Sequence, residues 1–160
     1  MSAESAVMSF GRPKPTQAIM LGGLIVGVLD ISSAFVLSAL RGGTPVRVLQ
    51  GIASGLIGAD AFNQGMLAAA LGLGLHFLVA FVATTIFYFL SRKLTFMVEQ
   101  PLVSGPLYGI AVCLFMYMIV LPLTFHRSYF TSFSTVITPI LVHIFCVGLP
   151  MALVVRHYSK

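Results

Sequence analysis

Four long apolar stretches, separated by short polar segments, dominate the pattern of hydrophobic and polar positions along the chain. Each stretch is long enough to cross a bilayer as a helix, since about 20 apolar residues at about 1.5 Å per residue span the hydrocarbon core. The predicted spans cover about residues 18–40, 66–90, 102–125 and 135–156. We therefore expect an all-α fold, a four-helix bundle of transmembrane helices that forms one membrane domain over residues 1–160.

The connection between the first two spans carries a shorter helical pattern at about residues 45–57. Thr44 and Pro45 suit an N-cap followed by proline at the first helical position, where the missing N–H costs nothing. This helix is too short to cross the membrane. We expect it to lie in the membrane interface or to enter the membrane and return on the same side.

Prolines affect the two later spans. Pro122 is expected to kink or stop the third span, and Pro150 to kink the fourth, because proline cannot donate the helical hydrogen bond. The start of the fourth span has two interpretations. It begins near Thr135 with Pro139 as a kink, or Thr138 caps a helix whose first residue is Pro139.

Composition agrees with a membrane location. Of the 160 residues, 58% are hydrophobic and 8% are charged, whereas about 25% are charged in a typical soluble domain. The nine basic residues are scattered around the span ends instead of forming the basic run of a nucleic-acid-binding protein, so the expected partner is the lipid bilayer and not nucleic acid.

The basic residues also predict the orientation. The larger group flanks one side of the spans and the smaller group the other, so the positive-inside rule places both termini in the cytoplasm. The larger group is Arg12, Lys14, Arg92, Lys93, Arg156 and Lys160, and the smaller is Arg41, Arg47 and Arg127.

Each predicted span carries an ionisable or thiol side chain near its middle, and the four candidates are Asp30, His76, Cys113 and His143. In an up-down-up-down arrangement the helical rise places all four in a layer roughly 5 Å deep. An ionisable group in hydrocarbon costs free energy, so it indicates either function or a protein partner. His76 and His143 would face each other across the bundle axis, because the second and fourth spans are diagonal when the spans follow one another around the bundle.

Three kinds of site fit this layer: a proton or coupling-ion site, a metal site and a haem site. Asp30, His76 and His143 are the residue types that relay protons or bind a coupling ion. With Cys113 they also match the ligands of a tetrahedral zinc or copper ion. As a simpler alternative, each histidine hydrogen-bonds a serine, threonine or tyrosine of a facing helix and holds the helix register, which contributes about 1 kcal/mol. Cys113 and Tyr117 are weaker site candidates.

The third kind of site is a haem b held between two axial histidines, His76 and His143. Gly72 and Gly74 would then leave room for the macrocycle. Glycines also recur at helical spacing on several spans, where they let neighbouring helices approach closely. The glycines expected to serve helix packing are Gly23, Gly27, Gly72, Gly105 and Gly109.

Motifs of the common enzyme classes do not occur: the chain has no G-x-S-x-G, no H-E-x-x-H and no glycine-rich phosphate loop. We therefore do not expect an enzyme. The first functional hypothesis is a small transporter or an ion- or proton-binding membrane protein. The alternatives are an accessory subunit, whose small-residue stripes dock a larger membrane complex or a second copy, and a haem b electron-transfer protein.

Four short segments suggest a family: Gly74-Leu75-His76-Phe77, Gly105-Pro106-Leu107-Tyr108-Gly109, Val120-Leu121-Pro122-Leu123 and Ile140-Leu141-Val142-His143. Over about residues 65–155 the chain resembles the small inner-membrane proteins of the YagU type. The resemblance implies a bacterial inner-membrane location, with one histidine in an apolar span and a second in the last span. It implies no biochemical function, and the loop between the first two spans differs from the family pattern.

Overall fold

Four helical segments are long and apolar enough to cross a membrane in the computed structural model, which describes residues 14–125 and 133–159. These residues are almost all helical, with short turns between the helices and no strand among them. The prediction of four apolar, membrane-length helices is confirmed, and the predicted limits agree to within about one helical turn. These segments are Pro15–Ala39, Gly65–Lys93, Pro101–Phe125 and Thr135–Ser159.

The first span is helix α1 (Pro15–Ala39), which ends before a glycine turn. Gly42 takes φ 76°, in the left-handed region that glycine adopts without steric cost. Thr44 then caps helix α2 (Pro45–Ile57), because its hydroxyl accepts a hydrogen bond of 3.3 Å from a backbone N–H in the first turn. This cap confirms the N-cap predicted from the sequence. The 3₁₀-helix η1 (Gly58–Asn63) follows.

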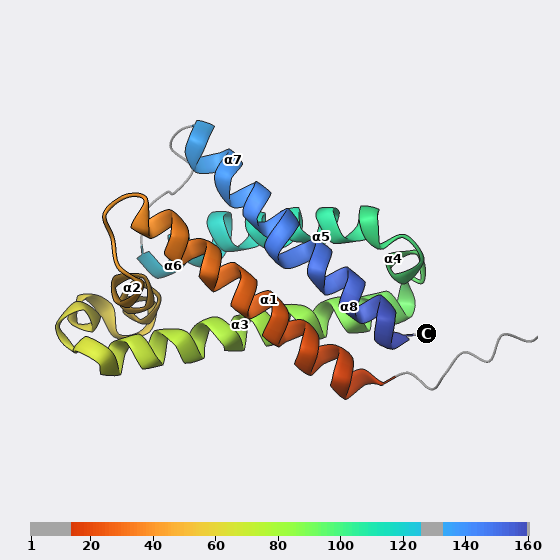
Figure 1. Cartoon of the computed structure of the whole chain (residues 1–160), viewed down its shortest axis with the longest axis horizontal. Helices are drawn as coiled ribbons and strands as arrows, with labels where there is room; N and C mark the ends of the chain where they lie inside the picture. Colours follow the sequence, from red (N-terminus) through yellow and green to blue (C-terminus); the bar gives the residue numbers. More distant parts are fainter. Residues whose placement is uncertain (1–13, 126–132, 160) are drawn as a thin grey trace, which may run out of the picture.

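Helix α2 packs against the start of the second span, α3 (Gly65–Lys93) (Figure 1). The buried side chain of Gln50 donates a hydrogen bond of 3.1 Å from Nε2 to the Gly65 carbonyl. Gly72 lies directly against the backbone carbonyl of Leu49, so a side chain at Gly72 would push α2 away. A small apolar cluster completes the contact. Its buried members are Ala53, Ala61 and Ala68, and Ile57 and Leu71 pack against them.

The third and fourth spans each contain a π-helical turn. The third span consists of α5 (Pro101–Phe115), η2 (Met116–Val120) and α6 (Leu121–Phe125), and the short helix α4 (Phe96–Glu99) precedes it. The fourth consists of α7 (Phe133–Val142), η3 (His143–Gly148) and α8 (Leu149–Ser159).

Both π-helical turns have a proline as their cause. The ring of a proline clashes with the carbonyl four residues earlier, and for Pro122 and Pro150 that carbonyl lies inside η2 or η3. The wider turn absorbs the clash, so each span continues through its proline. Pro122 therefore does not stop the third span. Pro139 lies inside α7, which begins at Phe133, so the alternative start at Thr138 is wrong.

Helix α1 packs between α3 and the fourth span, and α5 packs against η3 and α8 (Figure 1). Helices α3 and α5 meet through side chains. The ring of Phe87 lies edge-on to Tyr108 with 4.9 Å between centroids, and the Tyr108 hydroxyl donates a hydrogen bond of 2.8 Å to the Ala83 carbonyl.

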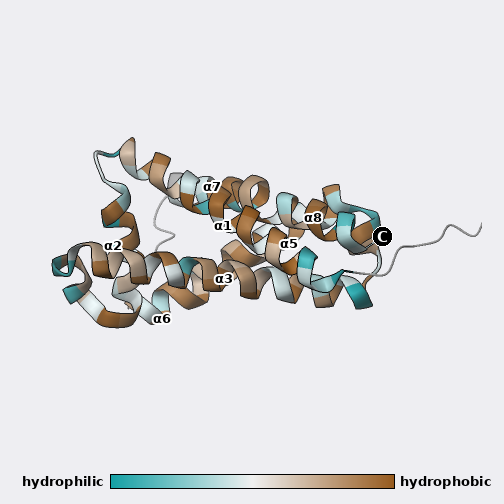
Figure 2. Ribbon diagram, turned by 60° about the horizontal axis from the view of Figure 1, so that its bottom comes forward, coloured by the Kyte–Doolittle hydropathy of each residue, from teal (hydrophilic) through white to brown (hydrophobic). Residues whose placement is uncertain are grey.

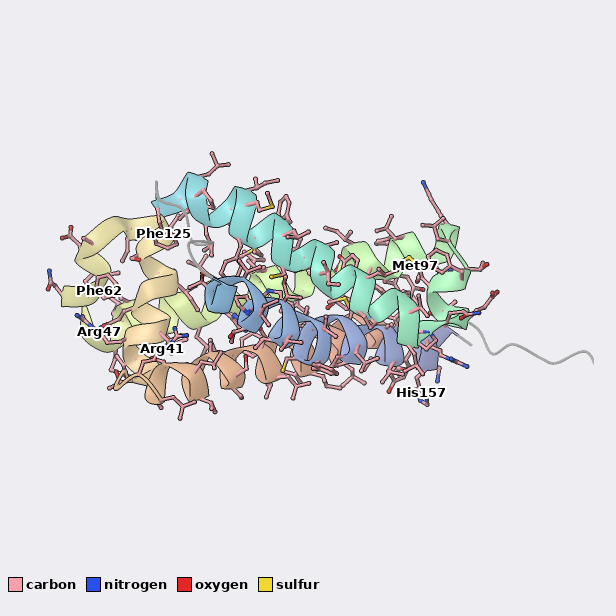
Figure 3. The ribbon with its side chains drawn as sticks, turned by 90° about the horizontal axis from the view of Figure 1, so that it is seen from above. Arg41, Arg47, Phe62, Met97, Phe125 and His157 are labelled. Carbon is pink, nitrogen blue, oxygen red and sulfur yellow. The ribbon has the colours of Figure 1, made fainter. Side chains whose placement is uncertain are left out.

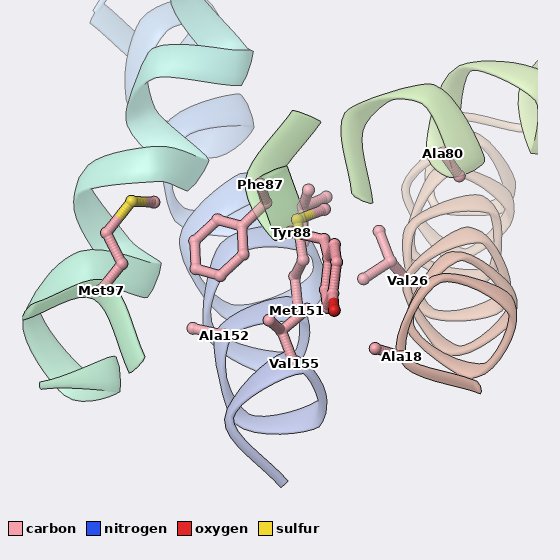
Figure 4. Close-up of a cluster of buried hydrophobic side chains, with 10 residues drawn as sticks. Ala18, Val26, Ala80, Phe87, Tyr88, Met97, Met151, Ala152 and Val155 are labelled. Atoms are coloured by element: carbon pink, nitrogen blue, oxygen red, sulfur yellow. The ribbon is translucent and has the colours of Figure 1, made fainter. Parts of the chain in front are cut away.

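Buried side chains from α1, α3, α4, η3 and α8 form a packed apolar core toward the end of the molecule opposite α2 (Figure 1), and Figure 4 shows this core in close-up. Phe87 is fully buried there, together with Met151 and Val155. The Lys14 N–H joins the two ends of the chain by donating to the Tyr158 carbonyl at 3.1 Å. The core residues are Ala18, Val26, Ala80, Phe87, Tyr88, Met97, Val147, Met151, Ala152 and Val155.

Apolar side chains also cover much of the outer surface, and the polar residues lie mainly at the two ends (Figure 2). Arg41 and Arg47 lie at the end that carries α2, whereas His157 lies at the opposite end (Figure 3). Such a surface is unfavourable in water over so large an area but is compatible with lipid. Arg12, Arg127 and Lys160, which entered the orientation argument, lie outside the described residues.

The Tyr108 hydroxyl provides a test of the contact between α3 and α5. We expect Tyr108→Phe to lower the free energy of unfolding by about 0.5–1 kcal/mol, because hydrogen bonds between membrane helices contribute about that much. Unfolding by SDS in mixed micelles, followed by circular dichroism, measures the change. An unfolding midpoint equal to that of the wild type would contradict a stabilising role for this hydrogen bond.

Candidate functional site

Two neighbouring cavities of about 840 and 410 Å³ lie among the spans, close to α2. They share part of one wall, and that wall carries all three of the main candidates predicted from the sequence. The shared residues are Asp30, Ile52, His76, Met116, Leu121 and His143. The fold therefore brings Asp30, His76 and His143 from three different spans to one place.

The larger cavity is lined mainly by apolar side chains of α2, α3 and the third span. Leu78 and Val79 belong to this lining although they are 58% and 44% exposed. The cavity therefore continues to the outer face of α3, which is an apolar face. The smaller cavity has more polar residues in its lining, namely Ser33, Arg41, Tyr117, Thr135 and Thr138.

Asp30 is a half-buried residue of α1, the helix that also carries the packing glycines Gly23 and Gly27. The nearby hydroxyl of Ser33 donates a hydrogen bond of 2.7 Å to the backbone carbonyl of Asp30 and so does not serve the carboxylate. Within residues 14–125 and 133–159, no cationic side chain forms an ion pair with this carboxylate.

His76 joins the second span to the first. Its ring Nε2 lies 2.9 Å from the carbonyl oxygen of Gly27. A carbonyl only accepts hydrogen bonds, so Nε2 carries the proton, and Nδ1 is an acceptor in the neutral ring. Gly27 accommodates the neighbouring ring of Phe77, which would meet a Cβ at Gly27 at 2.5 Å.

His143 is oriented by its own helix. Its Nδ1 donates a hydrogen bond of 2.8 Å to the carbonyl of Pro139, one turn earlier. The proton on Nδ1 leaves Nε2 as the acceptor of the neutral ring. The ring of Tyr117 lies edge-on to it with 6.2 Å between centroids. Both histidines therefore hydrogen-bond backbone carbonyls, whereas the register alternative predicted a serine, threonine or tyrosine partner. Only the hydrogen bond of His76 joins two helices.

The described residues do not assemble the predicted zinc or copper site. Among them, no group of three or more histidine, cysteine, aspartate or glutamate side chains is arranged to hold a metal ion. Cys113 is fully buried and lines neither cavity, because its stripe on α5 faces the fourth span. The tetrahedral set with Asp30, His76 and His143 is therefore not formed.

The haem arrangement fits no better, because neither glycine makes room for a macrocycle. Gly72 is covered by the α2 backbone at Leu49, and Gly74 is exposed with no other atom within 4 Å of an added Cβ. His76 and His143 remain on the shared cavity wall. However, α2 fills the space beside Gly72, and Gly74 lies on the outer surface, so neither glycine leaves room for the haem.

The other packing glycines also lie at close contacts. Gly23 lies against the ring of Phe81 on α3. Gly105 would place a Cβ 2.9 Å from the carbonyl oxygen of Gly148, and Gly109 lies against the carbonyl of His143. Gly148 is a packing residue that the sequence analysis missed, although a glycine within the last apolar stretch was an available signal.

Met116 is a second residue that the sequence analysis did not identify. Its side chain lines both cavities. It follows Cys113 by three residues, and the period of the α-helix would place it beside the Cys113 stripe. The signal was weak, because methionine in an apolar span is ordinary.

A search for similar proteins finds no matching family model, no matching curated protein and no matching solved structure. The likeness to YagU-type proteins consequently stays a prediction.

Proposed function

We propose that the protein is a small multi-pass membrane transporter that carries protons by way of Asp30, with His76 and His143 on the same cavity wall. One observation carries the proposal: side chains from three spans line a wall shared by two cavities, and the acidic side chain on that wall, Asp30, has no cationic partner among the described residues.

Asp30 is half-buried, and a charge that is partly removed from water costs free energy. A carboxylate surrounded mainly by apolar side chains is unfavourable unless it is protonated or paired with a cation. No described side chain supplies that cation, so the Asp30 carboxylate is stabilised by a proton or by a cation that enters the cavity. Binding and release at Asp30 would then be tied to occupancy of the cavity. The acceptor nitrogens Nδ1 of His76 and Nε2 of His143 offer two further positions for a proton or for an N–H of a ligand.

We also propose an orientation. The basic side chains Lys14, Arg92, Lys93 and Arg156 gather at the packed end, so the positive-inside rule assigns that end to the cytoplasm. The cavities then open in the outer half of a bilayer, with α2 at the outer interface. The resemblance to YagU-type proteins supports a bacterial inner membrane, and the contacts of α1, α3 and α5 with their neighbours support a four-helix bundle.

Proton flux into liposomes tests the proposal. A potassium diffusion potential drives protons into vesicles that contain the purified protein and a trapped pH dye. We expect wild-type vesicles to acidify faster than empty ones, and Asp30→Asn to reduce the rate to that of empty vesicles. Asp60→Asn is the matched control, because Asp60 is exposed in η1 and outside both cavities. Equal rates for the wild type and Asp30→Asn would overturn the proposal.

A further inference from the structure

We propose that the larger cavity takes an amphipathic organic monocation, whose charged group lies at Asp30 and whose apolar body lies between α2, α3 and the third span. This inference rests on the site of the proposed function and names its ligand class.

The size and the lining of the cavity favour an organic ligand over a bare ion. Its volume of about 840 Å³ lies within the range of about 300–1,000 Å³ that small-molecule sites occupy. Metal ions require several oxygen, nitrogen or sulfur ligands at short distance, and the described residues offer no such group. Apolar side chains such as Leu75, Val79, Val112 and Val120 instead provide a surface for an apolar body.

The charge of the lining favours a cation. Asp30 is the acidic residue in the lining of the larger cavity, and no lysine or arginine is among the described residues that line it. Arg41 lines the smaller cavity. An anion in the larger cavity would meet the Asp30 carboxylate without a compensating charge, whereas a monocation would neutralise it. The acceptor nitrogens of His76 and His143 also suit a positive group.

The position of the lining residues indicates the route of entry. Leu78 and Val79 line the cavity from the exposed face of α3, whereas Asp30 lies on α1. A ligand dissolved in the outer half of the bilayer would therefore enter beside α3 with its apolar body among the lipid chains. Its charge would reach Asp30 at the inner wall. A small hydrophilic cation lacks the apolar body that this lining would hold.

Equilibrium dialysis with three radiolabelled probes tests the ligand class on the purified full chain. Tetraphenylphosphonium carries one positive charge on an apolar body, tetraphenylborate has the same shape with a negative charge, and tetramethylammonium has the charge without the large body. We expect saturable binding of tetraphenylphosphonium, at least tenfold weaker binding of the other two probes, and at least a tenfold loss of tetraphenylphosphonium affinity in Asp30→Asn. Asp60→Asn should bind as the wild type does.

A second variant tests the cavity without changing charge. Met116→Trp adds bulk where both cavities meet, and we expect it to weaken tetraphenylphosphonium binding at least tenfold. Met118→Trp is its matched control, because Met118 belongs to the same π-helical turn but is 63% exposed and lines neither cavity.

The outcomes separate this inference from the proposed function. Binding of tetraphenylborate equal to that of tetraphenylphosphonium, or phosphonium binding that survives both Asp30→Asn and Met116→Trp, would overturn the ligand class. Proton flux that depends on Asp30, in a wild-type protein that does not bind tetraphenylphosphonium, would overturn this inference alone. Asp30-dependent phosphonium binding without any protein-dependent proton flux would instead overturn the proposed function and leave the ligand class standing.

Discussion

Gly109→Ala should lower the free energy of unfolding by about 3 kcal/mol, near the upper end of the usual cost of overpacking. A Cβ at Gly109 would overlap the backbone carbonyl of His143 and would lie 3.2 Å from the Cα of Ile144. These are backbone atoms, so no side-chain rotation can relieve the contact. The third and fourth spans would have to separate and lose dispersion contacts along α5, η3 and α8.

Gly74→Ala is the matched control for Gly109→Ala. Gly74 also lies inside a span, but an added Cβ would have no neighbour within 4 Å. We expect its unfolding free energy to stay within about 0.5 kcal/mol of the wild type, as for most surface substitutions. SDS-induced unfolding in mixed micelles, followed by circular dichroism, compares the two variants. Equal stability of both would show that the close approach of α5 and η3 is not a source of stability.

The second large effect is expected for Phe87→Ala, which should cost about 3 kcal/mol. Phe87 is 0% exposed, and its ring contacts Tyr108 on α5. In a membrane the loss does not come from exposure to water, because lipid is as apolar as the side chain. It comes from the cavity left behind and from the dispersion contacts that the ring makes with its neighbours.

Phe89→Ala controls for this substitution on the same helix. Phe89 is 59% exposed, so lipid can fill the space that its ring leaves. We expect a change of less than about 0.5 kcal/mol in the same unfolding assay. A loss for Phe89→Ala as large as that for Phe87→Ala would indicate that the outer face of α3 is packed against protein in the micelle, as in a homo-oligomer or a larger complex.

Part of the candidate site was predictable from helical period and depth. Asp30, His76 and His143 are polar residues near the middle of apolar stretches, and hydrocarbon tolerates such residues where they face protein or a cavity. Cys113 followed the same rule and was misplaced as a ligand, because a thiol is apolar enough to pack against a neighbouring helix. The position of a residue along its span therefore identified the polar residues near the middle of the membrane. It could not distinguish a residue that lines the cavity from one that packs in the core.

The π-helical turns explain why the sequence could not predict which residues of the third and fourth spans face the cavities. An α-helical period of 3.6 residues predicts which residues of a span share a face. A π-helical turn contains more residues, so it rotates everything after it relative to everything before it. Met116 and His143 are the first residues of η2 and η3, and both line the cavities. Pro122 and Pro150 indicated a kink, but the direction of the rotation required the tertiary structure.

The sequence by itself determined the four apolar helices, because a bilayer demands about 20 apolar residues and internally paired backbone groups in every span. It also determined the polar residue types near their middle. Only the tertiary structure decided that Gly72 packs against α2 and leaves no space for a macrocycle, and that Gly109 lets the third span contact the fourth closely. It also decided that Asp30, His76 and His143 line one wall. The physical reason is that a cavity depends on how closely helices approach along their whole length. That distance is set by pairs of facing residues distant in the chain, which no local period encodes.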